Sequence, residues 1–241
     1  MQRRIRTTLL AGLVAVTTVT LDAQSTRSYV QAVHLKPDMV TEWLNLQRTE
    51  VIPAQKKGGV TSRTTLVTAV GESFEYLIIT PFPDWAAMDG DSPLVKGLGA
   101  EGAARLNEKL RRCILGQHTY MTNRQDSLSI PAADAPIWSQ VVRQFAPGKQ
   151  EEYLAFYKRE MLPALLKAKA AGKIAGSTLA TRGRGAPAGE FVEVTHYATF
   201  SQMQGQNPLG QQVAAQLAQR SASLASSKIT VVRRRVADLS F

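Results

Sequence analysis

Three histidines, His34, His118 and His196, offer the most versatile chemistry in this sequence. An imidazole titrates near neutral pH and can serve as a general base, a general acid or a metal ligand. The histidines lie far apart, and together with the single cysteine, Cys113, they form no recognisable metal-ligand spacing. The Cys-x-x-Cys-His motif of covalent haem is absent, and nothing further supports non-covalent haem on His34 or His196. We therefore expect neither a metal nor another cofactor.

One group of polar and aromatic side chains has two interpretations. If one half of the chain keeps a polar interior, they line a pocket for a small ligand, with His196 or His34 as a base. In the plainer interpretation the polar members are half-buried strand residues, and the aromatic members belong to a hydrophobic core. The group consists of His34, Trp43, Arg143, Tyr153, Glu193, His196 and Tyr197.

Two acidic residues, Glu75 and Glu193, are expected in the middle of strands. A carboxylate at such a position must reach solvent or find a partner, because burial of an unpaired charge is costly. Arg63, Arg182 or the basic segment at residues 233–235 (RRR) could supply that partner.

Other catalytic motifs are absent from the sequence. There is no Gly-x-Ser-x-Gly, and no grouping of Ser, His and Asp stands out. Residues 183–189 (GRGAPAG) lack the lysine and the helix start of a phosphate-binding loop, so we expect a hairpin there. Cys113 has no histidine beside it and is expected to be a small buried hydrophobic residue on a helix. The sequence leaves open whether the protein is an enzyme.

The N-terminus has the layout of a secretory signal peptide. A basic stretch at residues 1–6 (MQRRIR) precedes an apolar run at residues 8–21, and Ala23 then precedes polar residues. The apolar run is shorter than the roughly 20 residues of a bilayer span, which disfavours a retained anchor. We therefore expect residues 1–23 to be removed, the protein to be exported to the periplasm or secreted, and no stable membrane insertion.

The formal net charge of +10 is compatible with several classes of partner. An exported protein rarely meets nucleic acid, and the basic residues are scattered except at residues 233–235. We expect a solvated basic surface and no nucleic-acid partner. A small-molecule ligand and self-association into a homo-oligomer are the partners that the sequence leaves open.

The chain contains an internal repeat. Residues 35–53 (LKPDMVTEWLNLQRTEVIP) match residues 145–163 (FAPGKQEEYLAFYKREMLP), with Trp43 aligned to Tyr153. Further matches follow in the same order, such as GESFEY with GEFVEV and RQDSLS with RVADLS. An order that holds across the whole mature chain predicts a tandem duplication.

Each copy has the same order of predicted elements, β-α-β-β-α-β, which is the ferredoxin-like arrangement. Alternating β-branched and aromatic residues predict the strands, and a 3.6-residue period predicts the helices. Pro53 and Pro163 are expected to bend or end the first helix of each copy. The strands are expected at residues 29–35, 60–70, 74–82, 118–124, 138–143, 174–182, 191–200 and 229–235.

These elements predict an α+β protein in which two tandem ferredoxin-like repeats bury their open sheet faces against each other. The result would be an intramolecular dimeric α/β barrel. We place the first repeat at residues 24–130, a linker at residues 131–136 and the second repeat at residues 137–241.

Residues 146–176 (APGKQEEYLAFYKREMLPALLKAKAAGKIAG) and residues 191–200 (FVEVTHYATF) carry a family resemblance. The chain resembles the dimeric α/β-barrel superfamily and, within it, NIPSNAP-like and antibiotic-biosynthesis-monooxygenase-like domains. The first copy departs from this pattern, because Asp38 replaces the glycine of the helix start. The resemblance implies a fused pseudo-dimer. The superfamily includes cofactor-free oxygenases, haem-degrading enzymes, isomerases of small cyclic compounds and proteins with no assigned reaction, and the fold does not choose among them.

Three hypotheses for function follow. The first is a non-catalytic protein that binds a small apolar or anionic molecule between sheet and helices, and the second is a cofactor-independent monooxygenase or isomerase of small cyclic compounds. The third is a structural or assembly protein. A cavity between sheet and helices with His196 or His34 facing into it would favour the enzyme, and a cavity filled by side chains would favour the structural role.

Overall fold

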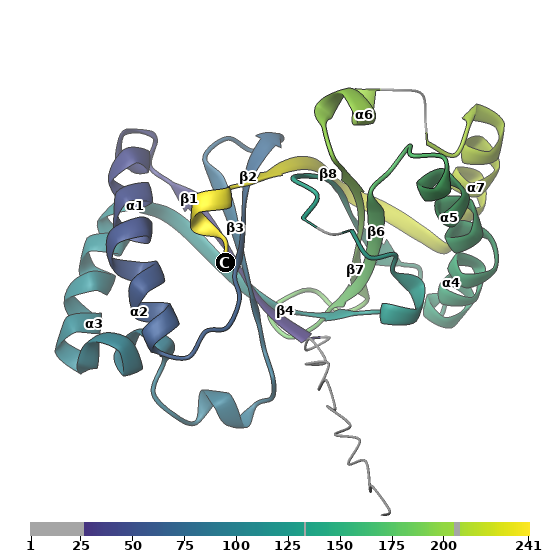
Figure 1. Ribbon diagram of the computed structural model, residues 1–241. Coiled ribbons are helices and arrows are strands. Elements are labelled where there is room, and N and C mark those ends of the chain that lie inside the picture. Colours follow the sequence, from purple (N-terminus) through teal and green to yellow (C-terminus); the bar gives the residue numbers. More distant parts are fainter. Residues whose placement is uncertain (1–26, 133, 205–207) are drawn as a thin grey trace, which may run out of the picture.

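The computed structural model describes residues 27–132, 134–204 and 208–241. The predicted signal peptide, residues 1–23, lies outside the described residues. The described residues form two halves with the same order of main elements (Figure 1).

The first half has four strands. Its strands are β1 (Arg27–Leu35), β2 (Thr64–Val70), β3 (Glu75–Pro81) and β4 (Ile114–Arg124). Its helices are α1 (Val40–Leu46), α2 (Ile52–Lys57) and α3 (Pro93–Cys113), with short 3-10 helices at Pro37–Met39, Ala86–Met88 and Asp126–Leu128.

The second half repeats this order. Its strands are β5 (Ile137–Phe145), β6 (Gly176–Arg182), β7 (Glu190–Tyr197) and β8 (Ala225–Arg235). Its helices are α4 (Gln150–Phe156), α5 (Leu162–Ala170), α6 (Phe200–Gln204) and α7 (Gln211–Leu224), with a 3-10 helix at Ala237–Leu239. The eight predicted strands are present. β4 and β8 start earlier than predicted, at Ile114 and Ala225, directly after the preceding helix.

The eight strands form a closed barrel in the order β1-β3-β2-β8-β5-β7-β6-β4. β2 pairs with β8 and β4 pairs with β6, so the two half-sheets join at two seams. The helices of the two halves lie on opposite outer sides of this barrel (Figure 1). The α+β class and the closed barrel of the prediction are therefore confirmed.

Each strand has one face toward the barrel interior and one toward the helices, because successive side chains of a strand point to opposite sides. On β1, Val30 packs in the interior with Leu66 and Leu77. Val33 and Leu35 point the other way and pack in the core beneath α1 and α3. Any side chain on a strand can therefore reach only one of these two environments.

The first helix of each half continues through its proline, unlike the predicted bend or end. A π-helical turn, Gln47–Val51 or Tyr157–Met161, lies directly before the helix that contains Pro53 or Pro163. Proline lacks the backbone N–H that an α-helix needs at that position. The wider π turn accommodates the missing donor, so each helix runs on.

Each half completes the core of the other. Leu239, from the end of the second half, is fully buried in the first-half core, and Leu128 and Ile130 are buried in the second-half core. Cys113 is also fully buried in the first-half core, as expected. Within the residues that the structure describes, no helix is both long and apolar enough to cross a membrane.

Candidate functional site

A cavity of about 440 Å³ lies between the sheet and the helices of the first half. Strands β1, β3 and β4 and the helices α1, α2 and α3 contribute to its walls. Its volume is in the range of small-molecule pockets, roughly 300–1,000 Å³. We call it the first-half cavity. The polar side chains of its lining are Gln31, Gln47, Gln55, Arg63, Asn107, Arg111 and Gln117.

Arg63 is the most deeply buried cation of the first-half cavity, with 1% of its surface exposed. Its Nε donates to Thr65 Oγ1 at 3.0 Å, Nη1 to Gln55 Oε1 at 2.8 Å and Nη2 to Gln47 Oε1 at 2.7 Å. All three acceptors are neutral. Burial lowers the pKa of Arg63 to about 10, because water is replaced by a less polar surrounding.

Backbone pairing places Arg63 at this position. Its N–H donates to the main-chain oxygen of Phe241 at 2.6 Å, and the N–H of Phe241 donates back to Arg63 O at 2.9 Å. The C-terminal segment of the second half therefore fixes the base of the Arg63 side chain.

The rest of the first-half cavity is apolar. Trp43 is 1% exposed and packs against Tyr76 with ring centroids 4.8 Å apart, which holds its ring in one orientation. The apolar lining consists of Val33, Trp43, Val51, Ile78, Leu94, Leu110 and Ile114. The cavity thus combines a wall for an apolar group with a polar end around Arg63.

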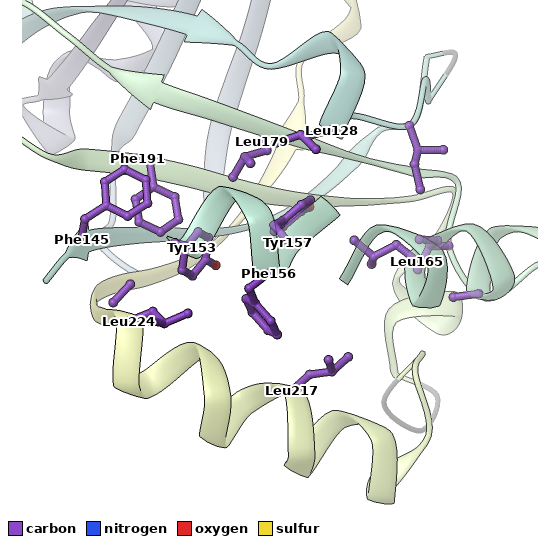
Figure 2. Packing of buried hydrophobic residues seen from close by; sticks show 14 of the residues in the cluster. Leu128, Phe145, Tyr153, Phe156, Tyr157, Leu165, Leu179, Phe191, Leu217 and Leu224 are labelled. Atoms are coloured by element: carbon purple, nitrogen blue, oxygen red, sulfur yellow. The ribbon is translucent and has the colours of Figure 1, made fainter. Parts of the chain in front are cut away.

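The equivalent space of the second half is filled. Tyr157 is the first residue of its π turn, where the first half has Gln47, and Leu165 is the fourth residue of α5, where α2 has Gln55. Figure 2 shows Tyr153, Phe156 and Tyr157 packed between the sheet and α7. The two halves share a backbone arrangement and differ in what fills it.

The counterpart of Arg63 in the second half is Ser177. Ser177 exchanges two backbone hydrogen bonds with Ile130, just as Arg63 does with Phe241. The second half therefore has a neutral serine at this place, within hydrogen-bond reach of the buried Tyr157.

Three of the seven predicted site residues come together in the second half. Arg143 Nε donates to Glu193 Oε2 at 2.8 Å, and the hydroxyl of Tyr153 donates to Glu193 Oε1. Burial, followed by the Glu193 carboxylate, raises the pKa of Tyr153. Burial lowers the pKa of Arg143, but Glu193 and Tyr153 outweigh it, so the pKa of Arg143 is raised overall. This cluster is closed on itself and leaves little capacity for a ligand.

The sheet separates His196 from that cluster. His196 points into the barrel interior, where its ring contacts Trp138 edge-on at 4.7 Å and its Nε2 is 2.9 Å from Thr178 Oγ1. Burial lowers its pKa to about 4, so the ring is neutral at pH 7. Its Nδ1 has no hydrogen-bond partner among the described residues. His196 and Glu193 therefore do not share a pocket, because residues an odd number of positions apart on a strand face opposite sides.

The other predicted residues lie apart from one another. Tyr197 belongs to the second-half core, and Trp43 lines the first-half cavity. His34 Nδ1 is 3.0 Å from Glu72 Oε1, near the surface.

Described residues of the barrel interior form ion pairs at two places. Arg233 pairs with Glu75 and also donates to Thr68 Oγ1 at 2.8 Å, so the basic segment 233–235 supplies the partner of Glu75. Arg182 pairs with Glu190 at 2.8 Å and lies over the ring of Tyr120, 3.9 Å from its centroid. Arg233 is thus an interior residue and not part of the expected solvated surface.

A smaller cavity of about 240 Å³ lies inside the barrel beside these groups. Trp138 and Thr178, the neighbours of His196, line it. Within the described residues no group of three or more His, Cys, Asp or Glu side chains could hold a metal ion.

Sequence reasoning missed the polar end of the first-half cavity. Arg63 entered only as a candidate partner for Glu75, whereas the structure pairs it with glutamines. A signal was present, because Gln47 and Gln55 lie on the buried face of an amphipathic helix, where the repeat has Tyr157 and Leu165. Polar residues at such positions require an interior partner.

Comparison with known proteins identifies the fold. No family model and no curated protein matches this chain. A proposed monooxygenase from Lactobacillus acidophilus superposes with a TM-score of 0.58 at 12% identity, over 89% of this chain and 94% of that one. An anthrone oxidase-like protein superposes with a TM-score of 0.57 at 12% identity, over 87% of this chain and 91% of that one. A haem-binding protein from Thermus thermophilus superposes with a TM-score of 0.50 at 12% identity, over 88% of this chain and 92% of that one. This chain has the dimeric α/β-barrel fold.

The haem-binding neighbour prompts a test of fit. An axial ligand to haem iron comes from His, Cys, Met or Tyr. The described residues that line the first-half cavity include none of these, and all three histidines of the chain lie elsewhere. The residues of this chain therefore do not fit haem in the first-half cavity.

Proposed function

We propose that this protein binds a small molecule in the first-half cavity. The observation that carries the proposal is the difference between two equivalent spaces. One is filled by Tyr157 and its neighbours, and the other is kept open around Arg63. Maintaining an open cavity forgoes packing energy, and a bound ligand compensates for that loss.

The hypothesis of a structural or assembly protein predicted that side chains fill the cavity. The first-half cavity is open, which favours binding. The enzyme hypothesis called for a cavity with His196 or His34 facing into it, and neither residue lines this one. Fold similarity to a proposed monooxygenase and an anthrone oxidase-like protein keeps a cofactor-independent monooxygenase or isomerase as the alternative function. Its base would then be another group than those two histidines.

Three narrower features belong to this proposal. The matched π turns and the matched backbone pairs of Arg63 and Ser177 support an origin by fusion of two copies. The NIPSNAP-like and antibiotic-biosynthesis-monooxygenase-like resemblance and export through a cleaved signal peptide rest on the sequence alone.

Native mass spectrometry of the protein purified from its own source tests the binding function. We expect a non-covalent small-molecule adduct on the wild-type protein. The variant Gln47→Tyr/Gln55→Leu/Arg63→Ser gives the first half the side chains of the second and should remove the adduct.

The matched control is Arg105→Met, which changes an exposed arginine of α3 that pairs with Glu101 outside the cavity. It should retain the adduct. A wild-type protein without any adduct, or an adduct that persists in the triple variant, would contradict the proposal.

A further inference from the structure

Arg63 is a buried cation whose guanidinium has no acidic side chain as a partner among the described residues. The other deeply buried arginine, Arg233, pairs with Glu75, and the half-buried Arg143 pairs with Glu193. Arg63 contacts only the neutral oxygens of Thr65 and two glutamines. Within the described residues, the first-half cavity has no Asp or Glu in its lining.

The hydrogen bonds at this end of the cavity leave donors in excess. A guanidinium carries five N–H groups, and three of them are engaged. Because arginine can only donate, Gln47 and Gln55 must turn their oxygens toward it, and their NH₂ groups remain for another acceptor. No described residue accepts from these NH₂ groups. The remaining hydrogen-bonding capacity around Arg63 is therefore almost entirely donating.

We infer that the ligand of the first-half cavity is an organic acid whose carboxylate binds Arg63. This inference rests on the proposed binding function and adds the chemical class of the ligand. A carboxylate supplies the missing negative charge and several lone pairs, and it matches the planar geometry of a guanidinium. It would also accept hydrogen bonds from the amides of Gln47 and Gln55.

The remainder of the cavity indicates the rest of the ligand. Trp43 and the aliphatic lining provide an apolar wall, so the acid carries a flat or cyclic apolar body. Arg111, an exposed residue of α3 that also lines the cavity, adds a second positive charge and disfavours cationic ligands.

Calorimetric titration with two matched probes tests the inference. 2-Naphthoate carries the carboxylate, and 2-naphthamide has the same shape without the charge. We expect the wild-type protein to bind the carboxylate at least about tenfold more tightly than the amide, since a charge-assisted hydrogen bond is roughly twice as strong as a neutral one.

The variant Arg63→Met keeps an unbranched side chain that fills the place of the arginine stem, and it removes the charge. In this variant the affinities for 2-naphthoate and 2-naphthamide should become about equal. Continued binding of the amide would show that the cavity is still folded. Arg63→Lys should restore part of the preference, and the exposed-site control Arg105→Met should leave both affinities unchanged.

Each other outcome is decisive. Equal binding of both probes by the wild-type protein, or a preference that survives Arg63→Met, would overturn the inference and leave the binding function in place. If neither probe binds, the adduct found by native mass spectrometry decides. An organic acid supports the inference, an uncharged molecule overturns it, and a protein without any ligand contradicts both the inference and the binding function.

Discussion

At the scale of single residues, this protein satisfies its buried charges in two ways. Arg143 has Glu193 and Tyr153 beside it, so its charge is neutralised inside the second half. Arg63 has neutral partners only, which leaves a net positive charge in the first-half cavity. Removal of one member of a buried ion pair is costly, so the Arg143 group is suited to stability, whereas Arg63 is suited to recognition.

His196 gives a pH dependence that can be measured. Burial lowers its pKa to about 4 in the folded protein, against about 6.5 in an unfolded chain. Between these values the unfolded state binds the proton more tightly, so the free energy of unfolding falls as the pH is lowered from 6.5 toward 4. The contribution lost by pH 4.5 is about 2–3 kcal/mol.

Urea unfolding at pH 7 and pH 4.5 checks this expectation. The variant His196→Gln retains a partner for Thr178 but does not titrate. Between pH 7 and pH 4.5 its free energy of unfolding should therefore fall by about 2–3 kcal/mol less than that of the wild-type protein. His118→Gln, at an exposed histidine, is the control and should behave like the wild-type protein. An identical acid loss in the His196 variant would show that the ring is not held neutral.

At the scale of elements, the covering helices of the first half pack closely. An added Cβ at Gly97 of α3 would lie 2.2 Å from the carbonyl oxygen of Ala54 in α2, which is closer than atoms can approach. Glycine therefore allows α2 and α3 to touch along their backbones. Leu94, in the same helical segment of α3 as Gly97, and Gln55 of α2 both line the first-half cavity, so the approach of these two segments sets the width of the cavity at this end.

Gly97→Ala should therefore force α2 and α3 apart. We expect a loss of about 1–3 kcal/mol in the free energy of unfolding, typical of overpacking, and weaker binding of 2-naphthoate. Thermal unfolding and calorimetry measure the two effects. Gly116→Ala, where an added Cβ meets no atom within 4 Å, should change neither. Unchanged stability in Gly97→Ala would mean that the helices can separate at no cost.

At the scale of the whole molecule, the two halves are joined through exchanged ends. Leu239 follows β8 of the second half but is fully buried in the first-half core, near the backbone pair of Arg63 and Phe241. Thr65 Oγ1 donates to Leu239 O at 2.7 Å. The first-half cavity therefore depends on a segment from the other end of the chain.

Leu239→Ala tests this dependence. Removal of a fully buried leucine side chain should cost about 2–5 kcal/mol, and it should also weaken 2-naphthoate binding in the first-half cavity. Leu115→Ala, at a leucine that is 65% exposed, should have little effect on either quantity. Full stability with normal binding in Leu239→Ala would show that the first half is complete without this segment.

The sequence by itself determined the order of the strands and of the main helices, and the closure of the two halves into one barrel. The alternation of strands such as β1 and the helical period around Trp43 are local patterns, and side-chain period is fixed by backbone geometry. The partner of Glu75 was also among the predicted segments, because a buried carboxylate demands a cation.

Only the tertiary structure decided which polar residues share a site. The predicted pocket joined His196 to Glu193 and Arg143, but barrel closure gave each strand two buried faces and placed His196 on the other side. Closure also brought Phe241 beside Arg63. Tyr157 packs in the core of the second half, whereas the first half has Gln47 at the matching position and keeps its cavity. Sequence pattern identifies which residues need partners, whereas the partners themselves come from contacts between segments far apart in the chain.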